Sequence, residues 1–275
     1  MITHKVTVNL DSTNTQTWRL YPIGDIHLGN VGCDKTALSR TIKTIKDDPL
    51  ARWIGLGDYA EYIGWTDPRF EPESVDKEYK VNDFKYWGQR MNRDVIKHFE
   101  PIADKCIGLM SGNHEKTVAD RYLFDPTADL AERLKAKYLG YECMIGFKVL
   151  RHTGRCDYGF DAYCHHGFGG GRKPGSVINN LVDLAAYYQA NLFLTGHTHK
   201  IISTKINRLR LTEKCKLVSE DVAFLVCGTY LRMKQENMEG YEVKKGLPPT
   251  FIGSPYIEIS NNKDMHGGYN FELRI

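Results

Sequence analysis

Five short apolar runs in this chain are each followed closely by glycine and by aspartate, asparagine or histidine. The runs are Trp18–Ile23, Arg52–Leu56, Cys106–Met110, Tyr158–Cys164 and Leu192–Thr195. Each has the length and the aliphatic or aromatic content of a buried β-strand. Functional sites in layered α/β folds form at strand ends, so the polar residues after these runs are candidate site residues. They are Asp25, His27, Asp58, Asn113, His114, His165, His166, His197 and His199.

Segments with helical spacing separate these runs. They are Lys35–Lys46, Phe84–Phe99, Ala128–Lys137 and Val177–Ala190. Strands that alternate with helices predict a layered α/β fold. The pattern changes after His199, where Ile201–Leu211, Leu217–Val226, Tyr256–Ile259 and Tyr269–Ile275 have the character of strands with few helices between them. We expect these four to form a second, more antiparallel sheet.

The chain has 275 residues, which suits one large domain. The segment from Tyr62 to Val81 is aromatic, acidic and contains proline, and a loop of this length is usually functional or disordered. We therefore predict a single domain over residues 1–275, with a loop and helix insertion around residues 62–100.

Composition restricts the class of protein. The net charge of +3 is too small to imply a nucleic-acid partner by itself. The seven cysteines are odd in number and include no CxxC pair, and the first ten residues have no apolar leader. No run approaches the roughly 18 apolar residues of a membrane span. We expect a cytoplasmic protein with reduced thiols and no membrane partner; the oligomeric state stays open.

The spacing of the polar residues favours metal binding. Side chains at positions i and i+2 of an extended backbone point to one side, so Asp25 and His27 can converge on one ion. His197 and His199 can reach one metal cluster in the same way. The carboxylate of Asp58 can bridge two cations, and Asn113 offers an amide oxygen. Imidazole with carboxylate suits Mn, Fe, Zn or Ni better than Ca, and we expect Mn²⁺ first.

Two divalent ions would outweigh the two aspartates, and the remaining positive charge would attract a phosphate oxyanion. Each motif alone has an ordinary structural explanation. An Asp-x-His pair can be a surface pair, Gly-Asn-His a turn, and Gly-His-Thr-His a solvated loop. Their occurrence together, in this order and each after a strand-like run, favours a metal site.

In the same order, the motifs GDIH, GD, GNHE, HHG and GHTH resemble the signature of the calcineurin-like metallophosphoesterases. The resemblance covers Gly24 to His199 and implies a β-sandwich of two mixed sheets flanked by helices, an α/β fold with four layers. It also implies two metal sites that share Asp58, with His114 as the general acid or transition-state stabiliser. The first metal would be held by Asp25, His27, Asp58 and His199, and the second by Asp58, Asn113, His197 and one of His165 and His166.

The adjacent histidines leave an ambiguity. Neighbouring strand residues point to opposite faces, so His165 and His166 cannot easily bind the same metal. The small or apolar residues Phe160, Ala162 and Cys164 alternate with the same period as His166 and predict a face packed inside the sandwich. We therefore favour His166 as the ligand, and a bend at the strand end would exchange the roles.

Several features bear on the substrate. Asp58 is followed by Tyr59, Ala60 and Glu61, not by the VDRG of the protein phosphatases, which argues against that class. The glycine-rich segment after His166 carries Arg172 and Lys173, which can bind phosphate or belong to a mobile surface loop. Basic residues after His199 can track nucleic acid or keep an edge strand charged. They are Lys200, Lys205, Arg208, Arg210, Lys214 and Lys216.

Aromatic residues after Asp58, namely Tyr59, Tyr62, Trp65 and Phe70, can stack bases or pack the loop. We expect an enzyme, a dinuclear metal-dependent phosphoesterase whose substrate is a phosphodiester or is related to nucleotides or nucleic acid. The alternatives are a phosphomonoesterase or nucleotide phosphatase, and a non-catalytic scaffold that keeps the site as a structural metal centre.

Overall fold

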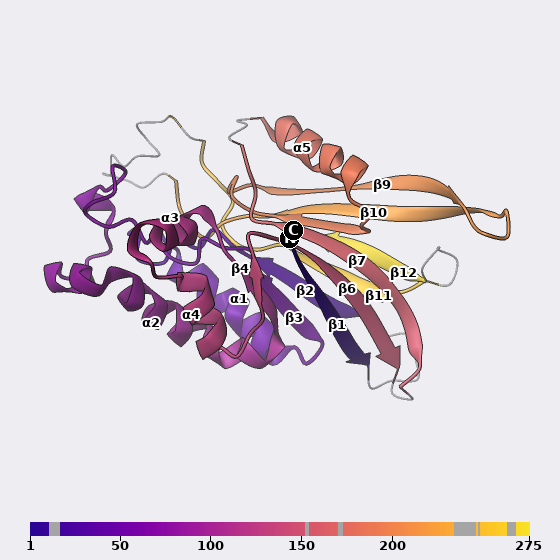
Figure 1. Ribbon diagram of the computed structural model, residues 1–275, viewed down its shortest axis with the longest axis horizontal. Coiled ribbons are helices and arrows are strands. Elements are labelled where there is room, and N and C mark those ends of the chain that lie inside the picture. The colour runs from indigo at the N-terminus through magenta and orange to yellow at the C-terminus, as the bar shows by residue number, and fades with distance from the viewer. Residues whose placement is uncertain (11–16, 152–153, 170–172, 234–245, 247, 263–267) are drawn as a thin grey trace.

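The computed structural model describes residues 1–10, 17–151, 154–169, 173–233, 246, 248–262 and 268–275. Two six-stranded sheets form its centre (Figure 1). One sheet has the spatial order β1 (Ile2–Leu10), β6 (Glu142–Arg151), β7 (Cys156–His165), β8 (Leu192–Thr195), β10 (Leu217–Cys227) and β9 (Ile201–Leu211). The other has the order β12 (Tyr269–Arg274), β11 (Tyr256–Asn261), β2 (Trp18–Ile23), β3 (Ala51–Gly55), β4 (Cys106–Met110) and β5 (Tyr138–Gly140).

Both sheets are mixed. In the first, β1 runs parallel to β6, and β7, β8 and β10 are parallel to one another, whereas β6–β7 and β9–β10 are antiparallel. In the second, β2 to β5 are parallel, and β11 and β12 extend the sheet in antiparallel pairing. The parallel strands lie in the middle of the fold and their carboxyl ends point the same way, which is what brings the motif residues together.

Helices cover the outer faces of both sheets (Figure 1). One side carries α1 (Lys35–Asp47), α2 (Trp87–Phe99), α3 (Asn113–Tyr122) and α4 (Pro126–Arg133), and the other carries α5 (Pro174–Tyr187). Short 3-10 turns cover Pro72–Ser74, Val81–Tyr86 and Glu100–Lys105. The order of layers is thus helix, sheet, sheet, helix, and the predicted fold class is confirmed.

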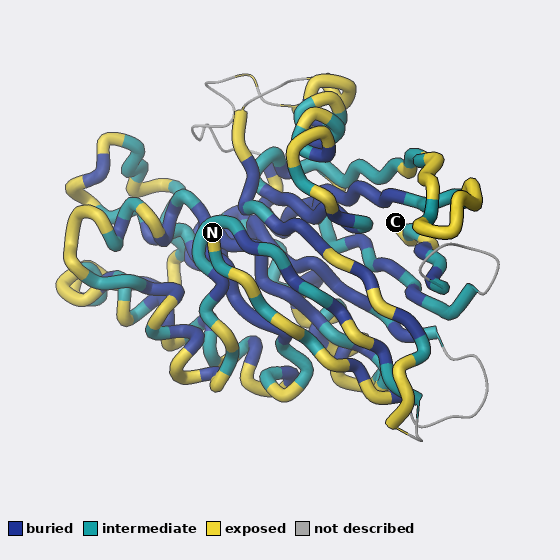
Figure 2. The backbone as a smooth tube through the Cα atoms, turned by 45° about the vertical axis from the view of Figure 1, so that its right-hand side comes forward, coloured by how far each residue is buried: buried dark blue, intermediate teal, exposed yellow. Residues whose placement is uncertain are grey.

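The apolar core has three parts. The largest lies between the two sheets and joins side chains such as Trp18 and Ile54 to Phe160 and Leu225. The second lies under α1, α2 and α4, and the third under α5. Strands such as β2 bury alternate residues in two different parts, with Leu20 toward the other sheet and Tyr21 toward the helices. Burial on both faces explains why these strands appear in the sequence as continuous apolar runs (Figure 2).

The prediction of a separate C-terminal sheet is wrong. β9 and β10 join the sheet of β6 to β8, whereas β11 and β12 join the sheet of β2 to β5. The physical reason is that each pair extends an existing apolar edge: β10 pairs with β8, and β11 pairs with β2. Within the described residues, no helix is long and apolar enough to cross a membrane.

Candidate metal centre

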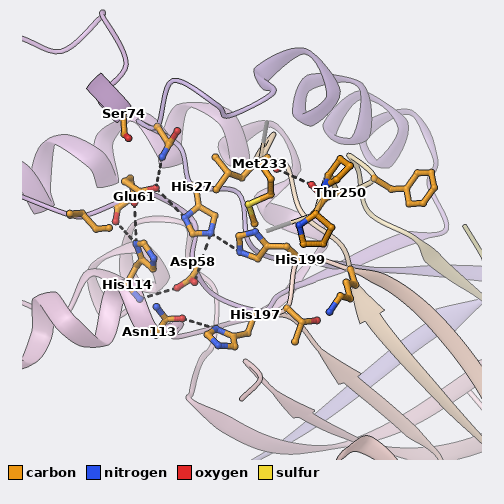
Figure 3. A pocket seen from close by; sticks show the side chains of 18 of the residues that line it. His27, Asp58, Glu61, Ser74, Asn113, His114, His197, His199, Met233 and Thr250 are labelled. Atoms are coloured by element: carbon orange, nitrogen blue, oxygen red, sulfur yellow. Dashed lines mark hydrogen bonds and ion pairs between the residues drawn. The ribbon is translucent and has the colours of Figure 1, made fainter. Parts of the chain in front are cut away.

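The polar residues that follow the buried strands gather at one end of the two sheets (Figure 3). Asp25 and His27 follow β2, and Asp58 follows β3. Asn113 and His114 open α3, which is separated from the end of β4 by two residues. His165 is the last residue of β7 and His166 follows it, and His197 and His199 follow β8. The structure thus brings both sheets into the same site, since β2 to β4 belong to one and β7 and β8 to the other.

Five of these residues have left-handed backbone conformations. Their φ angles are 49° at Asp25, 52° at His27, 53° at Asp58, 66° at His197 and 55° at His199. Residues other than glycine rarely adopt positive φ, and such residues cluster at functional sites where the surrounding structure holds them. The expectation of an extended backbone at the Asp-x-His and His-x-His motifs is therefore wrong. The side chains converge because each motif contains left-handed turns.

Hydrogen bonds between strand ends hold this backbone. The amides of Ile26 and His27 both donate to the Asp58 carbonyl, at 2.8 and 3.1 Å. The Asp25 carboxylate accepts from the His197 amide at 2.7 Å, which ties β2 to β8 across the two sheets. These bonds fix the turns that carry the side chains of the site.

Two glycines allow the ends of β3 and β4 to meet. Gly57 has φ +93°, and a Cβ placed on it would lie 2.3 Å from the amide nitrogen of Gly112. A Cβ on Gly112 would in turn lie 2.1 Å from Oδ1 of Asp58. Any side chain would push the two backbones apart, so the glycines of the GD and GNH motifs set the distance between Asp58 and α3.

Asp25, His27 and His199 form the first ligand group. The Nε2 atoms of His27 and His199 are 3.1 Å apart, and Nε2 of His199 is 3.5 Å from Oδ1 of Asp25. Oδ2 of Asp58 lies 4.0 Å from Nε2 of His27. All four residues are buried, with exposures of 0% for Asp25, 1% for Asp58, 4% for His27 and 9% for His199.

The second group contains Asp58, His166 and His197, together with Asn113. Nε2 of His166 lies 3.4 Å from Oδ2 of Asp58 and 3.0 Å from Oδ1 of Asn113. Nδ1 of His197 lies 2.9 Å from the same amide oxygen. Oδ2 of Asp58 is therefore near both groups, and His197 and His199 belong to different groups despite their two-residue spacing.

These contacts suit metal ions. Nitrogen and oxygen ligands at about 2.0–2.2 Å from one ion are roughly 2.9–3.6 Å from each other. The separations of 2.9–3.5 Å within each group fall in this range. Among the described residues, Oδ1 of Asp25 is buried and has no hydrogen-bond partner, although buried carboxylate oxygens normally accept one. A cation held by the first group would satisfy it.

The charges of the site depend on whether a cation is bound. Burial lowers the pKa values of His27 and His166, but the neighbouring carboxylates outweigh it and raise them to about 9 and about 10, so a bound cation would have to replace the protons on these rings. Burial raises the pKa of Asp25 to about 7, so this carboxylate is only partly ionised at neutral pH and a bound cation would favour its ionised form. Burial opposes ionisation of Asp58, but the charges of His166 and His114 and a hydrogen bond from His166 hold its pKa well below the usual value. Burial and the charge of His166 lower the pKa of His197 to about 4. Burial and the charge of His27 lower the pKa of His199 as well. Both imidazoles are thus neutral and keep a lone pair for a metal.

The adjacent histidines differ in position. His166 is fully buried, and its Nδ1 donates to the carbonyl of Leu56 at 2.7 Å, which leaves Nε2 facing Asp58 and Asn113. His165 lies outside both groups. Its Nδ1 accepts from the amide of Gly167 at 2.8 Å, and its ring contacts Tyr141 at a centroid distance of 5.3 Å. Of the two, only His166 is placed to reach an ion beside Asp58.

Glu61, which the sequence motifs did not indicate, contacts two of the site histidines. Its Oε2 accepts from Nδ1 of His27 at 3.2 Å, and its backbone carbonyl accepts from Nδ1 of His114. Burial lowers the pKa of His27, but the hydrogen bond to Glu61 and the charge of Glu61 outweigh it and raise the pKa to about 9. Glu61 therefore orients both rings, and each turns Nε2 toward the centre of the site.

Glu115 and Cys227 also support the centre without belonging to either ligand group. Glu115 accepts from the amides of Asp58, Tyr59 and Gly112 at 2.8–2.9 Å, which ties the turn of β3 to α3. Cys227 Sγ lies 3.7 Å from Oδ2 of Asp25. The fourth letter of GNHE could have indicated Glu115, whereas Glu61 and Cys227 gave no signal because they reach the site through the fold alone.

A cleft of about 970 Å³ opens over the centre. Its lining includes His114 and some members of each ligand group, namely His27, Asp58, Asn113, His197 and His199. It also includes residues of a wall at positions 63–75 and a second wall with Lys200, Met233 and Thr250 (Figure 3). Arg172 lies outside the described residues. Lys173 is exposed just before α5 and does not line the described part of the cleft.

The other residues that the sequence suggested for substrate binding lie in different environments. Tyr59 and Tyr62 are buried in the core, Trp65 is exposed, and Phe70 lines the cleft. Most of the basic residues after Lys200 lie on β9 or on the turn to β10, and β9 is an edge strand. Charge on an edge strand discourages pairing with other chains, which agrees with the structural interpretation of this cluster.

Among known proteins, the chain matches solved structures by their fold. No protein-family model and no curated protein matches the chain. A structure described as the calcineurin-like phosphoesterase YfkN from Bacillus subtilis is 12% identical, with 95% of this chain and 91% of that chain covered and a TM-score of 0.45. A metallophosphoesterase from Sphaerobacter thermophilus is 12% identical, with 94% and 88% covered and a TM-score of 0.40. A single mutant of Vps29 from Entamoeba histolytica is 12% identical, with 93% and 97% covered and a TM-score of 0.39.

Proposed function

We propose that this protein is a phosphoesterase that uses two divalent metal ions to hydrolyse phosphate esters, with phosphodiesters favoured. The observation that carries the proposal is the position of Asp58. Its Oδ2 lies 4.0 Å from Nε2 of His27 and 3.4 Å from Nε2 of His166, so one carboxylate serves both ligand groups. Two ions that share a ligand are the arrangement that binds both ends of a phosphate displacement.

The donor set indicates which ions would fit. Each group combines imidazole with carboxylate, and the second adds an amide oxygen, a set that suits Mn²⁺, with Fe, Zn or Ni as alternatives. The thiol of Cys227 lies beside the first ligand group, with Sγ 3.7 Å from Oδ2 of Asp25. Burial and the charge of Asp25 raise the pKa of its thiol well above the usual value, so it remains a thiol and a poor ligand.

When bound, the ions would supply Lewis acidity and an activated water. The protein's own contribution to bond cleavage would come from His114. Its amide donates to Oδ1 of Asp58 at 2.9 Å, and its Nδ1 donates to the Glu61 carbonyl. With Nδ1 fixed as a donor, Nε2 is the atom left to transfer a proton to the leaving oxygen. Oε1 of Glu61, 3.9 Å from Nδ1, places a negative charge where it stabilises the imidazolium.

The open cleft supports a diester over a small monoester. Lining residues extend from the ligand groups into two walls, and a volume of about 970 Å³ accommodates an ester group on each side of the phosphate. We infer a nucleotide or nucleic-acid fragment as the substrate class. The rival hypothesis is a scaffold that binds metal for structure alone. It differs from the enzyme in one respect: it would not need a proton donor at His114.

The test combines metal analysis with turnover. Metal-stripped protein is reconstituted with Mn²⁺, and we expect two ions per chain by inductively coupled plasma mass spectrometry. The same sample should release nitrophenolate from bis-p-nitrophenyl phosphate faster than from p-nitrophenyl phosphate. Two bound ions without turnover of either ester, or of DNA, RNA and cyclic nucleotides, would favour the scaffold. A preference for the monoester would favour the phosphatase.

A further inference from the structure

One wall of the cleft carries an arginine that belongs to none of the sequence motifs. Arg69 and Phe70 follow Asp58 by about ten residues and line the same cleft as Asp58, Asn113 and His114. In the described lining, Arg69 and Lys200 are the basic side chains other than histidine. Besides the phosphate at the metal centre, the substrate could carry a second anionic group. Arg69 and Lys200 are the two candidates in this lining to bind it.

A buried carboxylate holds the guanidinium of Arg69 in place. Nε donates to Oδ1 of Asp67 and Nη2 donates to Oδ2, both at 3.0 Å. The Arg69 amide also donates to Oδ1 at 2.9 Å. The Asp67 side chain is only 4% exposed. Two parallel bonds fix the plane of the guanidinium, and since arginine has five N–H donors, the donors at Nη1 face away from Asp67.

The positive charge of Arg69 is not fully neutralised by Asp67. Asp67 also accepts from Nη1 of Arg121 at 3.0 Å, and Arg121 lies in the last turn of α3, the helix that begins with Asn113. One carboxylate therefore serves two guanidinium groups, which leaves a net charge of +1 for the three side chains. Arg121 does not line the described part of the cleft, so the surplus charge is presented to the cleft by Arg69.

The neighbours of Arg69 suit a nucleotide unit. Phe70 packs edge-on against Phe84 at 5.6 Å, and Phe84 stacks on Trp87 at 4.4 Å. Phe70 and Trp87 both line the cleft, as does the acidic residue Glu71. An arginine beside aromatic rings is the combination that binds a phosphate together with its sugar or base.

From this geometry we propose that Arg69 binds a second phosphate of the substrate, next to the one that is cleaved. This inference rests on the proposed function and narrows it, because the favoured substrates would then carry at least two phosphate groups. Two kinds of molecule have this chemistry: an oligonucleotide, in which a nucleoside separates the phosphates, and a dinucleotide joined by a pyrophosphate. Diesters with a single phosphate would gain nothing from Arg69.

A binding experiment tests the inference without turnover. Fluorescein-labelled oligo(dT) of eight nucleotides is titrated with the full chain in EDTA at several salt concentrations, and fluorescence anisotropy is recorded. Arg69→Gln should weaken binding on the order of 10-fold and reduce the slope of log Kd against log salt by about 0.7, the value for one lost phosphate contact in single strands. Arg121→Gln, which also removes a cation from Asp67, should match the wild type. Equal losses in both variants, or none in Arg69→Gln, would overturn the proposal.

Kinetics with Mn²⁺ distinguish the two sources of the second phosphate. The substrates are dTpdT, the 5′-phosphorylated pdTpdT, a dinucleoside diphosphate and bis-p-nitrophenyl phosphate. Two of these carry two phosphates, pdTpdT and the dinucleoside diphosphate. For whichever of them is preferred, Arg69→Gln should lower kcat/KM on the order of 10- to 100-fold, chiefly through KM. The loss should be far smaller for dTpdT and bis-p-nitrophenyl phosphate, which carry one phosphate. A loss of equal size for dTpdT and pdTpdT, with no larger loss for the dinucleoside diphosphate, would refute the inference. Failure of the wild type to hydrolyse any of the four would instead refute the proposed function.

Discussion

The ligand loops and the wall at residues 63–75 face the same cleft but are held in different ways. In the ligand loops, backbone groups pair with backbone or with buried carboxylates, as at Asp58, whose amide donates to Glu115 at 2.9 Å. The wall has backbone bonds too, such as that from the Val31 amide to the Ser74 carbonyl at 2.8 Å, and it adds a side-chain anchor, the pairing of Asp67 with Arg69 and Arg121. Trp65 in this segment is 72% exposed, whereas Asp25 and His166 are 0% exposed. The difference teaches that burial and backbone pairing hold the centre, while a side-chain ion pair orients Arg69 in a more exposed wall.

Asp58→Asn tests the ligand loops most strongly and should have the largest effect. The amide cannot supply a negative charge to two ions, so we expect loss of both metals and of nearly all activity. Metal content and hydrolysis of bis-p-nitrophenyl phosphate give the measurement. Asp120→Asn, an exposed carboxylate on α3, serves as the control and should behave as wild type. Two tightly bound ions and near-normal turnover in Asp58→Asn would show that this carboxylate is not shared.

The histidine pair gives the next largest effect, the loss of one ion. His166→Ala removes an imidazole whose Nε2 faces Asp58 and Asn113, so it should leave one metal per chain and severely reduced turnover. His165→Ala removes a hydrogen bond to the Gly167 amide and ring contacts, so it should keep both metals. The reverse stoichiometry would mean that the end of β7 rearranges when metal binds.

His114→Ala should leave both metals bound and slow turnover by about 10²–10⁴-fold, the scale of general acid–base catalysis. The loss should be smaller for nitrophenyl esters than for alkyl esters, because a good leaving group needs no proton. Steady-state rates on a matched pair of esters check this. Equal losses on both esters would show that His114 stabilises charge and does not transfer a proton. The contact of Glu61 with Nδ1 would then not serve to prepare Nε2 for proton transfer.

The sequence predicted much of the fold and the membership of the ligand loops. Strands β2, β4, β8 and β9 have the predicted bounds, because double burial or regular alternation appears directly in the sequence. β1, β6 and α3 were not predicted. The exposed residues of β1 alternate with partly buried ones, and α3 begins inside a motif that resembles a turn. Asp58, His166 and the other motif residues do meet in one site, because parallel strands end at one edge.

The sequence could not predict how the side chains converge or what surrounds them. The left-handed turns at Asp25 and His197 are joined by a bond between strand ends, which no local pattern specifies. Glu61 reaches His27 across 34 positions of the chain. Arg69 is an ordinary loop residue in the sequence, and it becomes a candidate for substrate binding only when Asp67 and the cleft are seen together.

The smallest expected effect concerns the wall, and it depends on pH. The hydrogen bond from Arg69 outweighs burial and holds the pKa of Asp67 at about 2 in the folded protein, below the ordinary value of 3.8. The ionised carboxylate therefore stabilises the fold above about pH 4, and this contribution is lost as the pH falls toward 2. Asp67→Asn, which cannot ionise, should lower the free energy of unfolding by about 2 kcal/mol at pH 7. Its deficit relative to wild type should shrink steadily below pH 4.

Thermal unfolding followed by circular dichroism from pH 7 to pH 3 measures this deficit, which corresponds to a difference in Tm of roughly 4–8 °C at neutral pH. Asp120→Asn should show no comparable deficit, since its carboxylate is exposed and its partner in the described part of the chain is Lys116 on the same helix. If the deficit of Asp67→Asn stayed constant or grew as the pH fell, the carboxylate would not be anchoring the wall through its charge. Arg69 would then lack the fixed orientation on which its contact with a second phosphate depends, and the two regions of the cleft would not differ in the way they are held.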